Sequence, residues 1–345
     1  MSVTNARRST TKPKATKIIV WLVGATVTLA VAGYAALEAS PWPSALLVRF
    51  LFDLGGERLS QALEKHVPAG VMERLNERYD AADRDALLDV FYPSQTAGTA
   101  PPPLTIVWVH GGGWVSGSKG HIANYAKILA GRGYTVVGVD YSIAPGKTYP
   151  TPVRQVNAAL AYLAKNAERL HLDASRFVLA GDSAGAQIAA QLANAISVPT
   201  YAAALGIAPA IDRTRLAGAI LYCGPYDMAE ADAPWLMARF RKTVLWSYSG
   251  GRDYATNPRF VTASVIKYVT KDFPPLFISV GNADPLLPQS LAFADALSAR
   301  GGRVDRLFFP KDYKPALPHE YQFDLDNEAG RRALESSIAF LSILR

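Results

Sequence analysis

The chain has 345 residues, half of them hydrophobic, and a formal net charge of +7 at neutral pH. Residues 1–17 contribute five positive charges and no negative ones, which leaves only +2 for the rest of the chain and excludes a nucleic-acid-binding surface. Cys223 is the single cysteine, so an intramolecular disulfide is excluded, and its apolar neighbours predict a buried core thiol without a catalytic or metal-binding role. The five scattered histidines form no metal-ligand cluster in the sequence.

The N-terminal region has the composition of a membrane anchor. After the basic tail at 1–17, residues 18–37 are free of charge over about the length that crosses a bilayer. The positive flank predicts a cytoplasmic tail, with the catalytic part of the chain on the far side of the membrane, periplasmic or extracellular. The alternative is a cleaved signal peptide and a secreted product, because Ala30-Val31-Ala32 offers a small-x-small cleavage site.

Residues 38–84 are expected to form a linker and a helical, cap-like segment. The pattern from Ser40 to Asp80 is helical and amphipathic, and it is interrupted at Pro68-Ala69-Gly70. We expect its short helices to pack over the functional site of the domain that follows.

From residue 85 to residue 345, strands and helices alternate, which predicts an α/β fold with a mostly parallel central sheet flanked by helices. The expected strands are 87–92, 104–109, 134–139, 176–180, 218–223, 276–280 and 304–309, and the expected helices are 121–130, 152–170, 184–196, 288–300 and 327–344. An insertion at 226–275 interrupts this order. It is either a helical cap whose aromatic side chains line a substrate pocket or an ordinary helical excursion with its own core; the aromatic residues are Trp235, Phe240, Trp246, Tyr248 and Tyr254.

The central motif is Gly181-Asp-Ser-Ala-Gly185, which lies between a predicted strand and a predicted helix. G-x-S-x-G in this context is the signature of a nucleophile elbow, a turn so tight that the serine takes strained backbone angles and needs small neighbours. The turn exposes the Ser183 hydroxyl at a helix N-terminus, which favours developing negative charge.

A serine needs a base to remove its proton and an acid to orient that base. In this architecture the chain order is serine, carboxylate, histidine, and His319 is the one histidine after Ser183. Asp284 is the preferred acid because it directly follows the strand 276–280. Asp227 is the second choice, and the remaining acids near His319 in sequence are Glu320, Asp324 and Asp326.

The negative oxygen of a tetrahedral intermediate requires hydrogen-bond donors. The backbone N–H of Ala184, the residue after the nucleophile, supplies one. The run Gly111-Gly112-Gly113 follows its own strand and can turn further N–H groups toward the same point, because glycine allows close approach of the backbone. His110 is expected to fix this loop structurally.

The chain resembles the α/β-hydrolase superfamily, and within it the hormone-sensitive-lipase-like carboxylesterase and lipase family. The resemblance covers about residues 85–345 and rests on the motifs His110-Gly-Gly-Gly-Trp114, Gly181-Asp-Ser-Ala-Gly185 and Asp140-Tyr-Ser-Ile-Ala-Pro145, together with Asp284 and His319. It implies an α/β-hydrolase fold with helical cap segments, an oxyanion hole formed by Gly112 and Gly113, and hydrolysis of short or medium acyl esters without a cofactor. Five positions depart from the family's usual residues, namely Trp114, Ser142, Gly146, Glu320 and Tyr321.

The sequence therefore predicts a membrane-anchored serine hydrolase that cleaves small carboxylic esters through an acyl-enzyme, with neither metal nor nucleic acid as a partner. A peptidase, amidase or acyltransferase with the same triad is the first alternative. A non-catalytic, hydrolase-like binding protein is the second, and it is disfavoured because no triad or oxyanion residue is missing.

Overall fold

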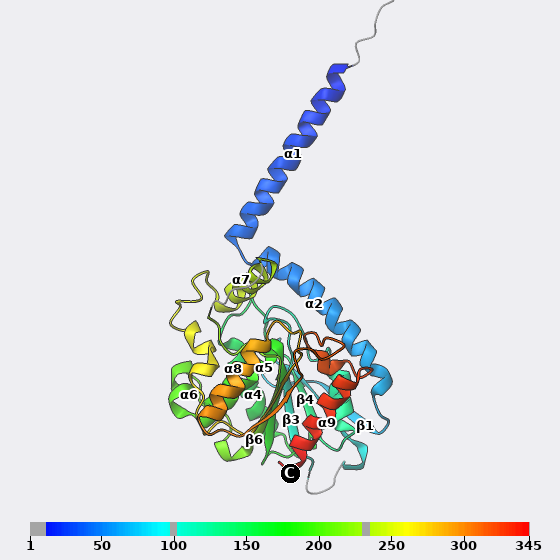
Figure 1. The fold of residues 1–345 in the computed structure, drawn as a ribbon, viewed down its shortest axis with the longest axis vertical. Helices are drawn as coiled ribbons and strands as arrows, with labels where there is room; N and C mark the ends of the chain where they lie inside the picture. The colour runs from blue at the N-terminus through cyan, green and yellow to red at the C-terminus, as the bar shows by residue number, and fades with distance from the viewer. Residues whose placement is uncertain (1–11, 97–101, 230–234, 345) are drawn as a thin grey trace, which may run out of the picture.

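The computed structural model describes residues 12–96, 102–229 and 235–344. An eight-stranded sheet with helices on both faces forms the body, and one long helix, α1, extends away from it (Figure 1). The predicted α/β fold with a mostly parallel sheet is confirmed. Of the basic tail at 1–17, residues 1–11 lie outside the described residues.

The strand order across the sheet is β1-β2-β4-β3-β5-β6-β7-β8. The pairs β1–β2 and β2–β4 are antiparallel, and the other five pairs are parallel. Parallel strands bring their carboxyl ends to one edge of the sheet, where loops from distant parts of the chain meet. The strands are β1 (Val71–Arg78), β2 (Leu87–Pro93), β3 (Thr105–Val109), β4 (Thr135–Val139), β5 (Phe177–Asp182), β6 (Leu216–Tyr222), β7 (Leu276–Val280) and β8 (Val304–Phe308).

Apolar side chains on both faces of the sheet explain why helices cover both. On β3, for example, Val107 and Val109 belong to one core cluster, whereas Ile106 and Trp108 belong to the other. The first cluster lies under α4 (Thr151–Lys165), α5 (Ser183–Ser197), α6 (Pro199–Leu205) and α8 (Leu287–Ala299), and the second under α3 (Ala123–Ala130) and α9 (Glu328–Ser342). Strands whose side chains are buried on both faces of the sheet are typical of a parallel sheet.

One part of the predicted helical segment between 40 and 80 is wrong. Val71–Arg78 is the edge strand β1, which pairs with β2. An edge strand has one partner and one covered face, and a register shift between Arg74 and Glu77 disturbs the alternation further. Its charged residues suggested an exposed helix face. On an edge strand, such residues disfavour pairing with a strand of another molecule.

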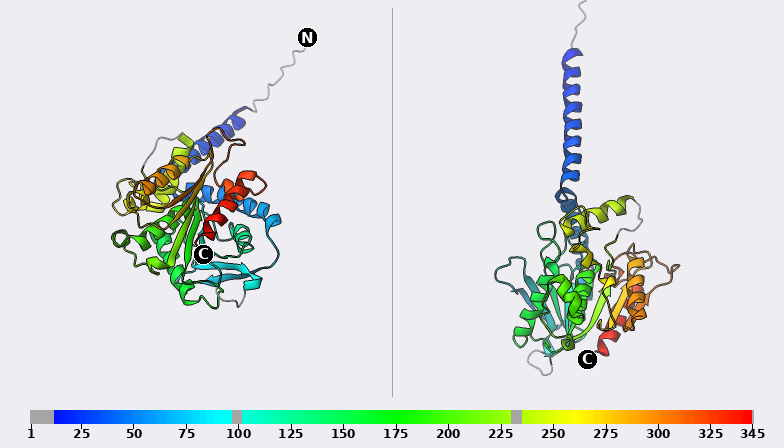
Figure 2. Two further views of the ribbon diagram at one scale, coloured as in Figure 1. Left: turned by 60° about the horizontal axis from the view of Figure 1, so that its bottom comes forward. Right: turned by 90° about the vertical axis from the view of Figure 1, so that its left-hand side faces the viewer.

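The N-terminal helices are α1 (Lys12–Ala39) and α2 (Trp42–Leu63). Within α1, Lys17–Ala39 has a mean hydropathy of 2.0 and no buried part, so by length and composition it could cross a membrane; a signal sequence meets the same criteria. The right-hand view of Figure 2 shows α1 standing clear of the body, and Figure 1 shows α2 lying along it. The remaining helix, α7 (Trp235–Ser249), lies in the insertion and packs against α2.

Candidate active site

Ser183 lies at the carboxyl end of β5, where the strand turns directly into α5. Its backbone φ is +51°, a left-handed conformation that is strained for a residue with a side chain. The close packing of this turn explains Gly185, because a Cβ there would overlap the carbonyl oxygen of Val109 on the neighbouring strand. The local geometry is therefore that of the elbow expected from the motif.

His319 and Asp284 reach the serine from two other strand ends. His319 Nε2 is 3.0 Å from Ser183 Oγ, and His319 Nδ1 is 2.8 Å from Asp284 Oδ2. Asp284 follows β7 and is buried, and its other oxygen accepts a hydrogen bond from the backbone N–H of Leu286 at 2.7 Å. The structure thus brings the three residues into the nucleophile–base–acid arrangement that acyl transfer requires.

None of the other candidate acids is placed to orient His319. Asp227 accepts hydrogen bonds from Ser264 Oγ and the N–H of Ala229, which is a turn role. Asp326 pairs with Lys65 and His66 on the surface, and Asp324 is exposed. Glu320 is close, with Oε1 3.8 Å from His319 Nε2, but it lies on the side of the imidazole that faces the serine, where an orienting acid has no place.

The glycine-rich loop after β3 has the conformation expected of an oxyanion hole. Gly112 has φ +112°, and a Cβ there would overlap the carbonyl of Ser116, so only glycine fits. Gly113 also has a positive φ. Ala184 is the second residue of α5, and the first N–H groups of a helix have no acceptor within the helix.

Two neighbours hold this loop. His110 is buried, its Nδ1 lies 2.7 Å from the carbonyl oxygen of Gly111, and its ring stacks on Tyr141. Burial lowers the pKa of His110 to about 4, so it is neutral and structural, as expected. Asp53 on α2 accepts hydrogen bonds from Ser116 Oγ at 2.6 Å and from the N–H of Gly117 at 3.2 Å. The sequence did not indicate this role for Asp53.

Burial disfavours the charged imidazolium of His319, but the hydrogen bond to Asp284 and the charge of Glu320 stabilise it, and the pKa of His319 is raised well above 6.5. Burial also raises the pKa of Cys223 to about 11, so its thiol is neutral at pH 7. The carboxylates of Asp284 and Glu320 are therefore the negative groups that stabilise the imidazolium. Cys223 is buried as predicted, yet it borders the triad: its sulfur, an Asp284 oxygen and a His319 nitrogen lie within 4.8 Å of one another.

Two further carboxyl groups, those of Asp182 and Glu320, lie beside the serine. Asp182 is buried, and its Oδ1 accepts a hydrogen bond from Trp108 Nε1 at 2.7 Å. Burial, and then the charge of the neighbouring Glu320, raise the pKa of Asp182 well above its usual value. Glu320 has φ +60° at a position where the resembled family usually has glycine, which is the sequence signal that could have revealed the pair.

A pocket of about 200 Å³ opens at Ser183 and His319. Its apolar wall is built by Leu51, Phe52 and Leu59 of α2, with Phe323 opposite. The pocket-lining interpretation of the insertion is therefore wrong for the aromatic residues named above, since none of the five lines this pocket. Two of them pack against other parts of the chain: Tyr248 stacks on Trp114 of the glycine-rich loop, and Phe240 contacts Phe52 of α2. Trp235 is exposed.

Comparison with known proteins agrees with this geometry. The model of the BD-FAE family matches residues 88–297. The chain is 31% identical over 256 residues to carboxylesterase NlhH of Mycobacterium tuberculosis, covering 72% of this chain and 75% of that one. It is 30% identical over 228 residues to esterase LipQ of the same organism, covering 65% of this chain but 52% of LipQ, so it spans about half the length of that relative.

The crystal structure of esterase B from Lactobacillus rhamnosis shares the fold, with a TM-score of 0.74 and 23% identity over 89% of this chain and 95% of that one. The region that the BD-FAE family model matches, residues 88–297, contains Ser183 and Asp284 and ends before His319. The chain belongs to the BD-FAE family, and its catalytic domain is of the hormone-sensitive-lipase-like carboxylesterase type within the α/β-hydrolases.

Proposed function

We propose that this domain hydrolyses carboxylic esters of short or medium acyl chains through an acyl-enzyme on Ser183. The observation that carries the proposal is the continuous hydrogen-bonded path from Asp284 through His319 to the Ser183 oxygen at the mouth of an apolar pocket. A hydroxyl in this setting can lose its proton to the imidazole as it attacks.

In the proposed mechanism, Ser183 Oγ attacks the acyl carbon and its proton moves to His319 Nε2. The carbon–oxygen bond to the alcohol then breaks, and the departing alcohol takes that proton. A water molecule repeats the sequence: it gives a proton to His319 and attacks the acyl carbon, and Ser183 leaves with the proton restored. Asp284 holds the tautomer of His319 that leaves Nε2 free to accept.

The backbone N–H groups of Gly112, Gly113 and Ala184 are proposed to hold the negative oxygen in both steps. Such donors are fixed before the reaction begins, and losing one costs on the order of 10²–10³-fold in rate. Their support is the positive φ of both glycines and the position of Ala184 in the first turn of α5.

The test is turnover of p-nitrophenyl acetate and butyrate by the Ser183→Ala variant. We expect kcat to fall by on the order of 10⁴-fold or more, because the nucleophile is lost while the fold remains. Ser342→Ala is the control, since Ser342 is an exposed serine that bonds only to the carbonyl of Ala339. Normal activity of the Ser183→Ala variant would contradict the proposal.

We further propose that α1 anchors the enzyme, with its N-terminus in the cytoplasm and the catalytic domain on the other side of the membrane. The support is an unburied apolar helix that follows a basic flank. Cell fractionation tests this: a 37.2 kDa species that stays with the membranes through a salt wash is expected. A shortened, soluble species would show that the segment is a cleaved signal peptide instead.

A further inference from the structure

The first half of α2 has its polarity reversed relative to an ordinary surface helix. Its charged residues point inward: Arg49 donates to the carbonyl oxygens of Val115 and Ala144, at 2.7 and 2.9 Å. Asp53, one turn later, holds the oxyanion loop as described above. No other residue between 42 and 56 is charged, so the outer side of this half is wholly uncharged.

The outer side instead carries large apolar side chains at i, i+4 spacing. Phe50 is 61% exposed, Leu47 60% and Trp42 45%, and Leu46 lies between them on the same side. A soluble surface rarely carries so many contiguous exposed apolar groups without a partner.

The start of α7 extends this surface. Trp235 and Leu236 are 75% and 67% exposed, and α7 is held against α2 by the ring contact between Phe240 and Phe52. We name the combined surface the docking face; it comprises Trp42, Leu46, Leu47, Phe50, Trp235 and Leu236.

The position of α1 identifies what covers the docking face. Only Ser40 and Pro41 separate α1 from α2, and two residues span about 7 Å at most. Both ribbon views place the start of α2 and α7 at the foot of α1 (Figures 1 and 2). If α1 crosses a bilayer, the docking face therefore lies at that bilayer's surface.

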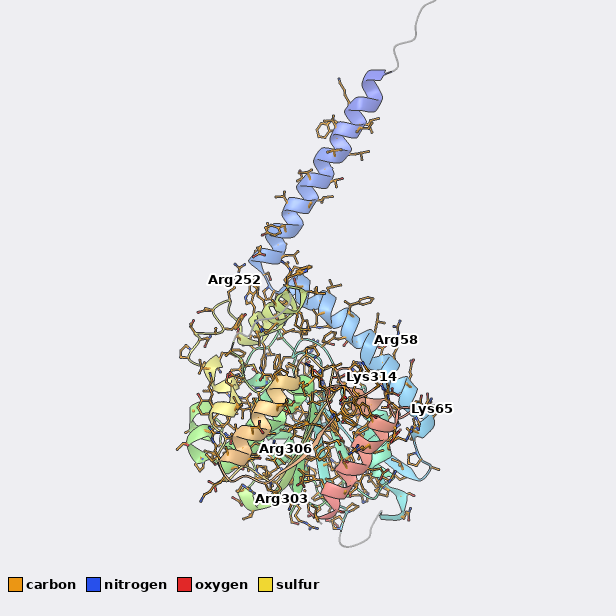
Figure 3. The ribbon with its side chains drawn as sticks, in the orientation of Figure 1. Arg58, Lys65, Arg252, Arg303, Arg306 and Lys314 are labelled. Carbon is orange, nitrogen blue, oxygen red and sulfur yellow. The ribbon has the colours of Figure 1, made fainter. Side chains whose placement is uncertain are left out.

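The charged residues around the docking face also fit a position at a bilayer surface. α7 contains three cationic residues and no acid, and Arg239 and Lys242 are exposed. Arg252 lies near the foot of α1, over the ring of Trp246 (Figure 3). Exposed tryptophans such as Trp42 and Trp235 are typical of segments that lie at the interface between a bilayer and water.

We propose that the docking face rests on the lipid bilayer that α1 spans, and that ester substrates dissolved in that bilayer reach the pocket along α2. The inference depends on the proposed anchor and on the proposed ester hydrolysis. Its link to catalysis is physical: Leu51 and Phe52 are exposed beside the docking face and also line the pocket at Ser183. The substrates it implies are esters with an apolar acyl chain that partition into membranes.

The first test locates the face in vesicles of phosphatidylcholine and phosphatidylglycerol that contain the full-length protein. A polarity-sensitive maleimide fluorophore is attached at Phe50→Cys or, as control, at Arg303→Cys, which lies at the end of the body opposite α1 (Figure 3). Cys223 is buried and does not compete for the label. We expect lipids carrying a shallow acyl-chain quencher to quench the label at position 50 and not the one at 303.

The second test separates docking from catalysis. The Leu47→Glu/Phe50→Glu variant changes two docking-face residues that do not line the pocket. We expect turnover of p-nitrophenyl decanoate dissolved in the vesicles to fall by about 10-fold, because two charged groups oppose contact with lipid, while turnover of water-soluble p-nitrophenyl acetate stays unchanged. Arg58→Glu/Gln61→Glu, two exposed residues of the polar half of α2, is the matched control and should affect neither substrate.

Equal quenching at positions 50 and 303, or none at either, would overturn the proposal, as would an unchanged rate on the vesicle-borne ester. Disulfide crosslinking between two Phe50→Cys chains without lipid quenching would assign the face to a second copy and also overturn it. If the wild type hydrolysed neither ester, the proposed function would fail, and the quenching result would still decide whether the face contacts lipid.

Discussion

The protonation state of His319 controls the proposed reaction. Only the neutral imidazole can accept the proton of Ser183, and the structure holds the pKa of His319 well above 6.5. A raised pKa means that the imidazolium persists to higher pH. The rising limb of kcat/KM should therefore lie on the alkaline side of 6.5, with little activity in mildly acidic solution.

Replacing Asp284 by Asn tests whether this carboxylate raises the pKa of His319. Removing the carboxylate removes the charge that stabilises the imidazolium, so the limb should move to lower pH, while kcat falls by on the order of 10³–10⁴-fold as the histidine loses its orienting partner. The measurement is the pH profile of kcat/KM on p-nitrophenyl acetate. Asp227→Asn is the control, and an equal effect of both changes would contradict the assignment of Asp284.

Residue identities at the site were predictable where chemistry is tied to a local turn. The elbow serine, the glycine run and the lone downstream histidine are each specified by a short motif or by elimination, and the structure brings them together. The proximity of Cys223 to His319 was not predictable, because it depends on which loops meet at the sheet edge. The closeness of Asp182 to Glu320 depends on the same loops, and its one sequence signal was the departure from glycine at Glu320.

At the scale of elements, α2 links the docking face to the catalytic loop. Its inner side fixes the loop through Arg49 and Asp53, and its pocket side supplies the apolar wall. The sequence predicted an amphipathic helix over the site. It did not show which side faces the protein, because the usual rule that charged residues face water is reversed here.

Asp53→Ala should therefore weaken catalysis from a distance. Ser116 and the N–H of Gly117 lose a charged partner whose hydrogen bonds each contribute about 1.5–3 kcal/mol, and the loop that carries Gly112 can relax. We expect kcat on p-nitrophenyl acetate to fall by about 10-fold with a smaller change in KM. Glu57→Ala, an exposed position one turn along α2, should leave kcat unaltered, and equal losses in both variants would contradict a specific role for Asp53.

The edge strand β1 illustrates a second limit on what the sequence predicts. The buried parallel strands were predictable from continuous apolar runs such as Thr105–Val109. β1 was not, because one face and one edge of it are solvated and its charged residues carry no period of two. Its identity depends on pairing with β2, which is a non-local property.

At the scale of the whole molecule, the chain combines a catalytic domain with a helix that is long and apolar enough to cross a membrane. In our proposal, α1 restricts the body to a membrane surface, and the reversed polarity of α2 suits that surface. The sequence indicated the anchor through length and charge asymmetry. It did not indicate that Leu51, Phe52 and Leu59 of α2 line the pocket, since this follows from how α2 packs.

The identity of the nucleophile is tested most directly by a serine-directed fluorophosphonate applied to the full-length protein, with the modified residue located by peptide mass spectrometry. An activated serine should react once, at Ser183, with complete loss of esterase activity, and Ser183→Ala should remain unlabelled. Modification at another residue, or equal labelling of the Ser183→Ala protein, would contradict the assignment of Ser183 as the nucleophile.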